Sequence, residues 1–172
     1  EEDVESIFLD AGAVVSIKSN GQNYLELQRV DLSQDISFYA TGGSDKTPPI
    51  PSGLTVTIPG AQFPAFTDVP FIDVGGFALT APGQGSAIRF DTVFTWQPID
   101  TNNPNIIVEI SASSFNTTVS CVTSDSGSFA FPEETQNELG TGFFANELSA
   151  SRIGYHVRFK DDAALVVYSL SQ

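Results

Sequence analysis

Apolar and polar residues alternate in many short runs along this chain, and Gly, Pro, Asn and Asp separate one run from the next. Alternation with a period of two residues is typical of β-strands that bury one face. Runs with a helical period are nearly absent. The pattern therefore predicts a protein built mainly of antiparallel β-strands.

The clearest predicted element is a hairpin near the N-terminus, with strands over 14–18 and 24–28. Asn20 and Gly21 lie between them, and an Asn-Gly pair favours a tight hairpin turn because both residues tolerate a positive φ. The same alternation predicts further strands over 54–58, 90–97, 106–110, 117–122, 128–131, 153–159 and 164–170.

Two of these strands carry information about the core. The run 90–97 places Phe94 and Trp96 on one face, so we expect both rings inside the protein. The run 164–170 is apolar on both faces, and such strands are usually covered on both sides. We therefore expect the last strand to lie at the centre of a sheet or to be well covered.

One short helix is expected over 132–139. Pro132 suits a first helical turn, and Glu133 and Glu134 favour the positive end of a helix dipole. Gly140 stands where a C-terminal cap would be placed.

Many short strands with one helix predict an all-β fold, a sandwich of two antiparallel sheets, because each strand must bury one face against another layer. A closed β-barrel is the alternative. The Pro-rich stretch near Pro49 is the one candidate boundary, and residues 1–40 are too few to hold a core of their own. A single domain over 1–172 is therefore expected.

The charge of the chain narrows the classes of partner. Seven Lys and Arg stand against 21 Asp and Glu, which gives a net charge of −14. Such a chain repels phosphate backbones and anionic lipid, so nucleic acid is disfavoured as a partner. No stretch reaches the roughly 20 apolar residues of a transmembrane segment. The acidic start and the absence of Met favour a mature or trimmed chain, from which a signal peptide, a lipoprotein tether or a tag has been removed.

Catalytic motifs give no support for an enzyme. His156 is the only histidine, so a serine triad would have to use it and a site with several imidazoles is excluded. Nucleophile elbows, phosphate loops and zinc-type spacings are missing. We therefore expect neither catalysis nor a cofactor, with calcium as the one alternative.

That calcium alternative rests on one loop. Asx side chains gather there, and Ca²⁺ prefers six to eight oxygen ligands; the four residues are Asp100, Asn102, Asn103 and Asn105. Turn chemistry explains the same loop, because Asp and Asn also bond their own backbone.

Two segments are candidates for binding a protein partner. Ile7, Phe8 and Leu9 follow an acidic start and are expected to form an edge strand, either in their own sheet or in a neighbour's. The run 152–160 predicts a solvent-facing basic stripe with Arg152, His156 and Arg158, which either pairs with neighbouring acids or docks a partner or an anionic ligand.

Short motifs spread over most of the chain resemble an uncharacterised β-sandwich domain of exported bacterial proteins and lipoproteins. They are Leu9-Asp10-Ala11-Gly12, Leu54-Thr55-Val56, Asp73-Val74-Gly75-Gly76-Phe77, Leu79-Thr80-Ala81-Pro82, Phe94-Thr95-Trp96, Cys121, and Gly127 through Phe131-Pro132. The resemblance implies export and a sandwich, and it brings no catalytic residue.

These observations favour a secreted or cell-surface structural or adhesive domain, which associates with itself, in the extreme as a filament subunit, or with another extracellular protein. The alternative is a carbohydrate- or calcium-binding module. A glycan site needs exposed rings beside polar groups. Trp96 is expected in the core, and the tyrosines are scattered among predicted strands.

Overall fold

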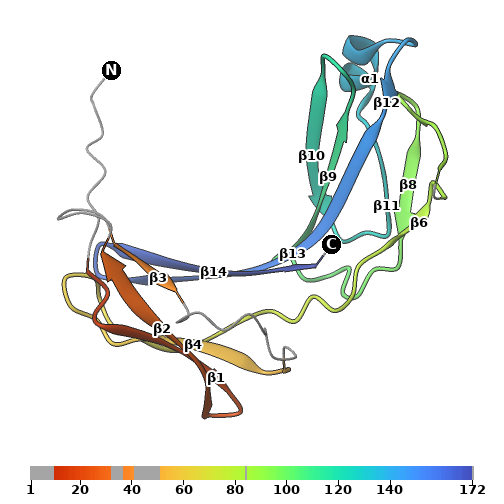
Figure 1. Cartoon of the computed structure of the whole chain (residues 1–172). Helices are drawn as coiled ribbons and strands as arrows, with labels where there is room; N and C mark the ends of the chain where they lie inside the picture. Colours follow the sequence, from red (N-terminus) through yellow and green to blue (C-terminus); the bar gives the residue numbers. More distant parts are fainter. Residues whose placement is uncertain (1–9, 32–36, 41–50, 84, 172) are drawn as a thin grey trace. The chain divides into compact units, whose positions relative to one another are not determined.

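The computed structural model describes residues 10–31, 37–40, 51–83 and 85–171, and this part of the chain is mostly β-strand with one helix (Figure 1). Its strands pair in antiparallel fashion. The expected all-β sandwich class is confirmed. The described sheets are open, so the closed-barrel alternative is wrong.

The elements follow in this order along the chain: β1 (Val14–Ser19), β2 (Gln22–Asp31), β3 (Ser37–Ala40), β4 (Leu54–Ile58), β5 (Phe66–Pro70), β6 (Leu79–Ala81), β7 (Ile88–Arg89), β8 (Val93–Trp96), β9 (Ile106–Ser113), β10 (Thr118–Ser124), β11 (Ser128–Ala130), α1 (Glu133–Leu139), β12 (Phe144–Ala145), β13 (Glu147–Lys160) and β14 (Ala163–Ser171).

The chain divides into two compact units. The first unit consists of Glu1–Phe71 and His156–Val167, and the second consists of Ile72–Tyr155 and Tyr168–Gln172. Strands β13 and β14 contribute residues to both units. The expectation of one domain over 1–172 therefore stays a prediction.

The first unit contains one sheet with the strand order β3-β2-β1-β4-β5. Its buried side chains come from this sheet and from β14, because Val167 joins the cluster and Leu165 packs against it. The sheet members of the cluster are Val15, Val56, Ile58, Phe66 and Val69. The segment of β14 in this unit thus covers one face of the sheet.

The predicted N-terminal hairpin is confirmed. Strands β1 and β2 pair directly, and Ser19 lies opposite Gln22 across the turn. Asn20 and Gly21 both have positive φ, 50° and 80°, as the turn that joins two twisted strands requires.

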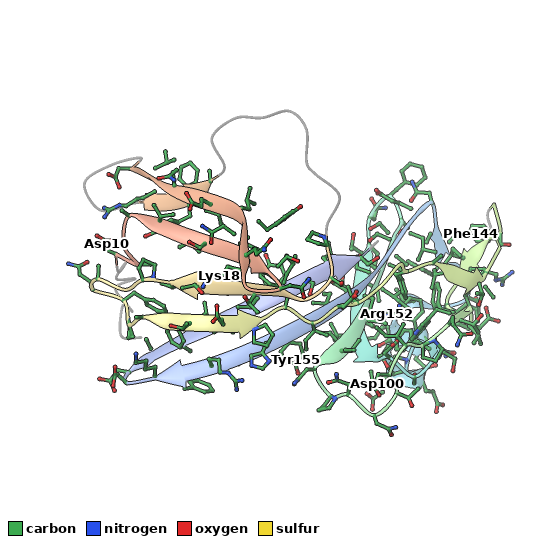
Figure 2. All side chains as sticks on the ribbon, turned by 90° about the horizontal axis from the view of Figure 1, so that it is seen from below. Asp10, Lys18, Asp100, Phe144, Arg152 and Tyr155 are labelled. Atoms are coloured by element: carbon green, nitrogen blue, oxygen red, sulfur yellow. The ribbon has the colours of Figure 1, made fainter. Side chains whose placement is uncertain are left out.

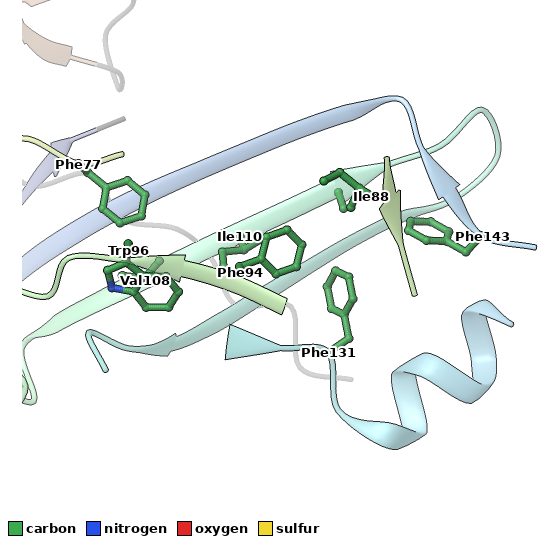
Figure 3. Packing of buried hydrophobic residues seen from close by; sticks show 9 residues of the cluster. Phe77, Ile88, Phe94, Trp96, Val108, Ile110, Phe131 and Phe143 are labelled. Carbon is green, nitrogen blue, oxygen red and sulfur yellow. The ribbon is translucent and has the colours of Figure 1, made fainter. Parts of the chain in front are cut away.

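The second unit is a sandwich, with the sheet β10-β9-β13-β14 and the smaller sheets β11-β8-β6 and β12-β7. Its core lies between the strands (Figure 3), where Phe94 packs edge-on against Phe131 at 5.6 Å between ring centres. Phe94 and Trp96 are buried as expected. The strand that carries them begins at Val93, because Phe90 and Asp91 form a turn closed by Thr92 N–H donating to the Arg89 carbonyl at 3.1 Å.

Helix α1 is close to its predicted bounds. The Pro132 carbonyl accepts a hydrogen bond from Gln136 N–H at 2.9 Å, and Gly140 ends the helix with φ of 69°. The acidic residues Glu133 and Glu134 occupy its first turn, where a helix dipole favours negative charge.

The expectation that the last strand is central or well covered is wrong. The sheet order places β14 at an edge of its sheet. Its residues alternate, so that one face packs inward while Val166, Tyr168 and Leu170 are exposed. The apolar residues on the outer face of β14 are therefore exposed at the surface of the described chain and are not covered by another layer.

Candidate functional site

Strand β14 has three exposed large apolar side chains, more than any other strand in the described part of the chain. Val166, Tyr168 and Leu170 are 55%, 67% and 52% exposed. They share one face because side chains alternate along a strand. An exposed apolar row of this kind is typical of a surface that another molecule covers.

The backbone of β14 is also suited to pairing. It lies at an edge of its sheet, and the nine residues from Ala163 to Ser171 include no charged residue and no proline. Natural edge strands are usually protected by Lys, Pro or a bulge, because their open N–H and C=O groups attract other strands. β14 shows neither of the two protective residue types. On the paired strand β13, Phe159 is exposed as well.

The expectation of a solvent-facing basic stripe is wrong at Arg152. This side chain is 1% exposed and lies among the side chains of the second unit (Figure 2). Its guanidinium is 3.3 Å from the Asp125 carboxylate, donates to the carbonyls of Val74 and Gly76 at 3.2 Å, and also donates to the Gln97 carbonyl. Its Cζ lies 5.0 Å from the centre of the Phe77 ring. Arg152 therefore cannot be offered to a partner by the folded chain.

Asp125 is the acidic half of this buried pair, and it is 1% exposed. Besides Arg152, it accepts hydrogen bonds from the Trp96 indole Nε1–H at 2.7 Å and from Ile99 N–H at 2.9 Å. Burying a charge is unfavourable unless it is paired and hydrogen-bonded, and this carboxylate is both. The cluster fixes the segment after β8 onto the end of β10, which is a structural role.

His156 and Arg158 belong to the first unit. His156 is half-buried, and among the described residues its Nε2 is a buried nitrogen for which the structure provides no hydrogen-bond partner. Arg158 is exposed. The structure thus leaves only Arg158 of the three predicted residues fully accessible to a partner.

The loop predicted to bind calcium shows the turn chemistry. Asp100 Oδ1 accepts from Asn102 N–H at 3.1 Å, and Asn103 Oδ1 accepts from Asn105 N–H at 3.1 Å. Figure 2 labels Asp100 in this loop. In the part of the chain that the structure describes, no three His, Cys, Asp and Glu side chains are grouped to hold a metal ion. A calcium ion on these four residues stays a prediction.

The remaining predicted partner-binding residues, Ile7, Phe8 and Leu9, lie outside the described residues. No helix in the described ranges is long and apolar enough to cross a membrane.

The thiol of Cys121, half-buried on β10, has a raised pKa because burial disfavours the thiolate.

The first unit has ion pairs at its surface. Arg29 bridges Asp10 and Asp31 at 2.5 and 2.6 Å, and Lys18 lies 3.0 Å from Asp68. The pKa of Asp10 is lowered, first because its carboxylate accepts a hydrogen bond from Gly12 N–H and then because Arg29 lies beside it. The pKa of Asp68 is lowered by its hydrogen bonds from Lys18 and Thr57. These groups tie β1, β2, β4 and β5 together at the surface.

Sequence reasoning missed both the exposed face of β14 and the Asp125–Arg152 pair. The sequence did indicate the exposed face of β14, because residues 164–170 are apolar on both faces. An uncharged strand at the edge of a sheet has the same sequence pattern as an uncharged strand at the centre, so the pattern did not show which of the two it was. Asp125 stands between Ser124 and Ser126 in a turn-like sequence, where nothing marks it as buried.

Comparison of the chain with protein-family models, with curated proteins and with solved structures found no match.

Proposed function

We propose that this protein is an exported structural or adhesive β-domain that associates with a second copy of itself through strand β14. One observation carries the proposal: an edge strand without charge exposes a row of three large apolar side chains. Pairing of edge strands is a common mode of protein association, in which backbone hydrogen bonds supply affinity and side chains supply specificity.

Charge favours a second copy meeting at this strand. Two chains with a net charge of −14 repel each other over most of their surfaces. Along β14 itself that repulsion is reduced, because its nine residues carry no charge. Removing apolar surface from water then contributes about 25 cal/mol for each Å² that is buried.

The strand is also complementary to itself. Two copies related by a two-fold axis at Val167 pair in antiparallel fashion, as isologous interfaces do. Val166 of one copy then faces Tyr168 of the second, and Ala164 faces Leu170. Aromatic side chains opposite β-branched ones are favourable cross-strand pairs, worth about 0.2–1 kcal/mol each. Every pair on the exposed face is therefore apolar.

The first experiment measures mass by light scattering after size exclusion over a range of protein concentrations. We expect the wild type to form dimers or larger assemblies with a Kd in about the micromolar range. The double variant Val166→Lys/Tyr168→Lys should be monomeric, because it places four cations in the paired edge. Val122→Lys is the matched control, since Val122 is 62% exposed on β10, the opposite edge of the same sheet.

Two outcomes would overturn the proposal. One is a wild type that stays monomeric at concentrations well above about 100 μM. Its Kd for self-association would then be weaker than we expect of a specific interface of standard size. The other is assembly that Val122→Lys abolishes and the β14 variant leaves intact.

A cross-linking experiment tests the register. Cys121 is the only cysteine, so Cys121→Ser gives a background without thiols. In that background a mixture of Val166→Cys and Tyr168→Cys chains should form a disulfide-linked heterodimer faster than either chain alone, because only unlike positions meet across the axis. Faster cross-linking of either chain alone would contradict this register.

The N-terminal segment is tested separately. If Ile7, Phe8 and Leu9 are donated to a neighbour, deletion of residues 1–9 abolishes assembly. If β14 carries the interface, the truncated chain assembles like the full chain. Loss of assembly on deletion, with no effect of the β14 variant, would replace our proposal by strand donation.

A further inference from the structure

A hollow of about 330 Å³ lies at the turn between β1 and β2 in the first unit. Sites for small ligands begin at roughly 300 Å³, so the hollow has room for one small ligand group. It is lined by Ser19, Asn20, Gln22, Asn23, Tyr24 and Pro51. Sequence reasoning assigned no function to this hairpin beyond its turn.

A β-bulge shapes the hollow. Ile17 lies opposite Leu25, whereas the next residue, Lys18, lies opposite Asn23, so Tyr24 is the additional residue of β2. In a regular strand Asn23 and Tyr24 would point to opposite faces. With the bulge, consecutive residues of β2 line the same hollow. Bulges of this kind redirect side chains beside functional sites.

The turn and its neighbours hold the polar groups in place. The positive φ of Asn20, 50°, belongs to the tight turn and fixes where its amide leaves the backbone. Ser19 Oγ donates to the Ser52 carbonyl at 3.2 Å, and Asn23 Nδ2 donates to Glu26 Oε1 at 3.1 Å. The lining is therefore organised by the fold before any ligand arrives.

The lining has a definite chemistry. Among the described residues that line it, three are amides, each with both donors and an acceptor, and none is charged. Tyr24 and Pro51 add the two rings of the lining. A neutral sugar ring has matching features, because its hydroxyls donate and accept while its C–H faces are apolar. The net charge of −14 disfavours an anionic ligand.

We propose that this hollow binds one neutral sugar unit of a glycan. The Tyr24 ring supports the apolar face of the sugar, and the amides of Asn20 and Gln22 bind its hydroxyls. The site lies on the β1–β2 hairpin and does not depend on β14, so the two proposals fail independently.

The test is an NMR titration of the ¹⁵N-labelled full chain with neutral tetrasaccharides of glucose, N-acetylglucosamine and galactose. We expect at least one of them to bind with a Kd of about 1 mM or tighter and to shift the amide signals of residues 19–24. Tyr24→Ala should weaken binding about tenfold or more, which corresponds to the loss of one ring contact.

Two further variants separate binding from folding. Asn20→Gly removes the amide while glycine keeps the positive φ of the turn, so weaker binding with an unchanged spectrum elsewhere supports a direct contact. Phe115→Ala removes a 93% exposed ring from the second unit and should leave sugar binding unchanged.

Three results would overturn the proposal. The first is the absence of any amide shift with about 10 mM of each neutral tetrasaccharide, because the affinity would then be too weak for a specific site. The others are shifts centred away from residues 19–24, and binding that neither Tyr24→Ala nor Asn20→Gly affects. Equal binding of an acidic tetrasaccharide would overturn the preference for neutral sugars.

Discussion

Phe94, Val108 and Ile110 of the second unit are completely buried, whereas the buried apolar residues of the first unit keep 4–7% of their surface exposed. The described ion pairs differ as well. The buried pair, Arg152 with Asp125, each 1% exposed, lies in the second unit, whereas the pairs of Arg29 and Lys18 in the first unit and the longer Arg89–Asp91 pair in the second lie at the surface. The second unit thus has a core between two layers of strands, with a buried ion pair. The core of the first unit lies between one sheet and part of β14.

This difference bears on function. A unit with a shallow core and surface ion pairs opens locally at lower free energy than one with a deep core. The hollow at the β1–β2 turn lies in the first unit, whereas the exposed row of β14 is divided, with Val166 in the first unit and Tyr168 and Leu170 in the second. We expect the second unit to be the more stable of the two. The predictions below test this contrast between the two units.

Removal of the buried arginine should have the largest effect. Arg152→Ala leaves the Asp125 carboxyl group in a buried site without its cationic partner, and breaking such a pair costs about 3–5 kcal/mol. The free energy of unfolding from urea denaturation measures this loss. The matched control is Arg158→Ala, on the same strand and exposed, which should leave the unfolding free energy close to that of the wild type. Equal effects of the two variants would refute the buried network.

Truncation of one isoleucine in each unit compares the two cores directly. Ile110→Ala and Ile58→Ala remove the same atoms, and such changes cost about 2–5 kcal/mol. Ile110 is 0% exposed and Ile58 is 7% exposed, so Ile110→Ala should lie nearer the upper end. Hydrogen exchange locates the loss. Amide protection should decrease in β8 and β9 for Ile110→Ala, and in β1, β2 and β4 for Ile58→Ala. A larger loss for Ile58→Ala would contradict the contrast between deep and shallow cores.

Glycine at 154 tests the packing around β13. A Cβ there would meet Val74 Cγ1 at 2.7 Å and Ile72 Cβ at 2.8 Å, closer than side chains approach each other. Gly154→Ala should therefore destabilise the protein by about 1–3 kcal/mol, as overpacking does. Gly76→Ala is the control, because a Cβ at Gly76 meets nothing within 4 Å. Thermal denaturation distinguishes the two, and equal melting temperatures would contradict the close contact.

Much of this architecture could be predicted from local sequence. The β1–β2 hairpin, β4, β9 and helix α1 lie where alternation, an Asn-Gly turn or capping residues indicate them. Strands β6, β7 and β12 have three, two and two residues, which is too short for a period of two to be visible. Their existence depends on partners that are distant in sequence.

The candidate surfaces were harder to predict, for a related reason. Alternation along β13 correctly puts Arg152 opposite Tyr155, but it does not say which face is inside. That choice depends on Asp125, which lies 27 residues earlier in the chain. The bulge at Tyr24 is likewise a property of the pairing with β1 and leaves no mark in the run of β2 itself.

Acid should have the smallest effect, and it should act on the first unit. The pKa values of Asp10 and Asp68 are lowered in the folded chain by hydrogen bonds and by the nearby cations Arg29 and Lys18. A carboxyl group with a lowered folded pKa contributes stability above its unfolded pKa, 3.8 for these residues, and loses it as the pH falls through the folded value. Hydrogen exchange near pH 3 should therefore show less protection in β1 and β2, relative to β8 and β9, than at pH 6. Asp10→Asn should reduce this pH dependence, because the amide does not titrate. If protection in β1 and β2 keeps its ratio to that in β8 and β9 from pH 6 to pH 3, surface ion pairs do not distinguish the first unit, and its shallower core alone must explain any lower stability.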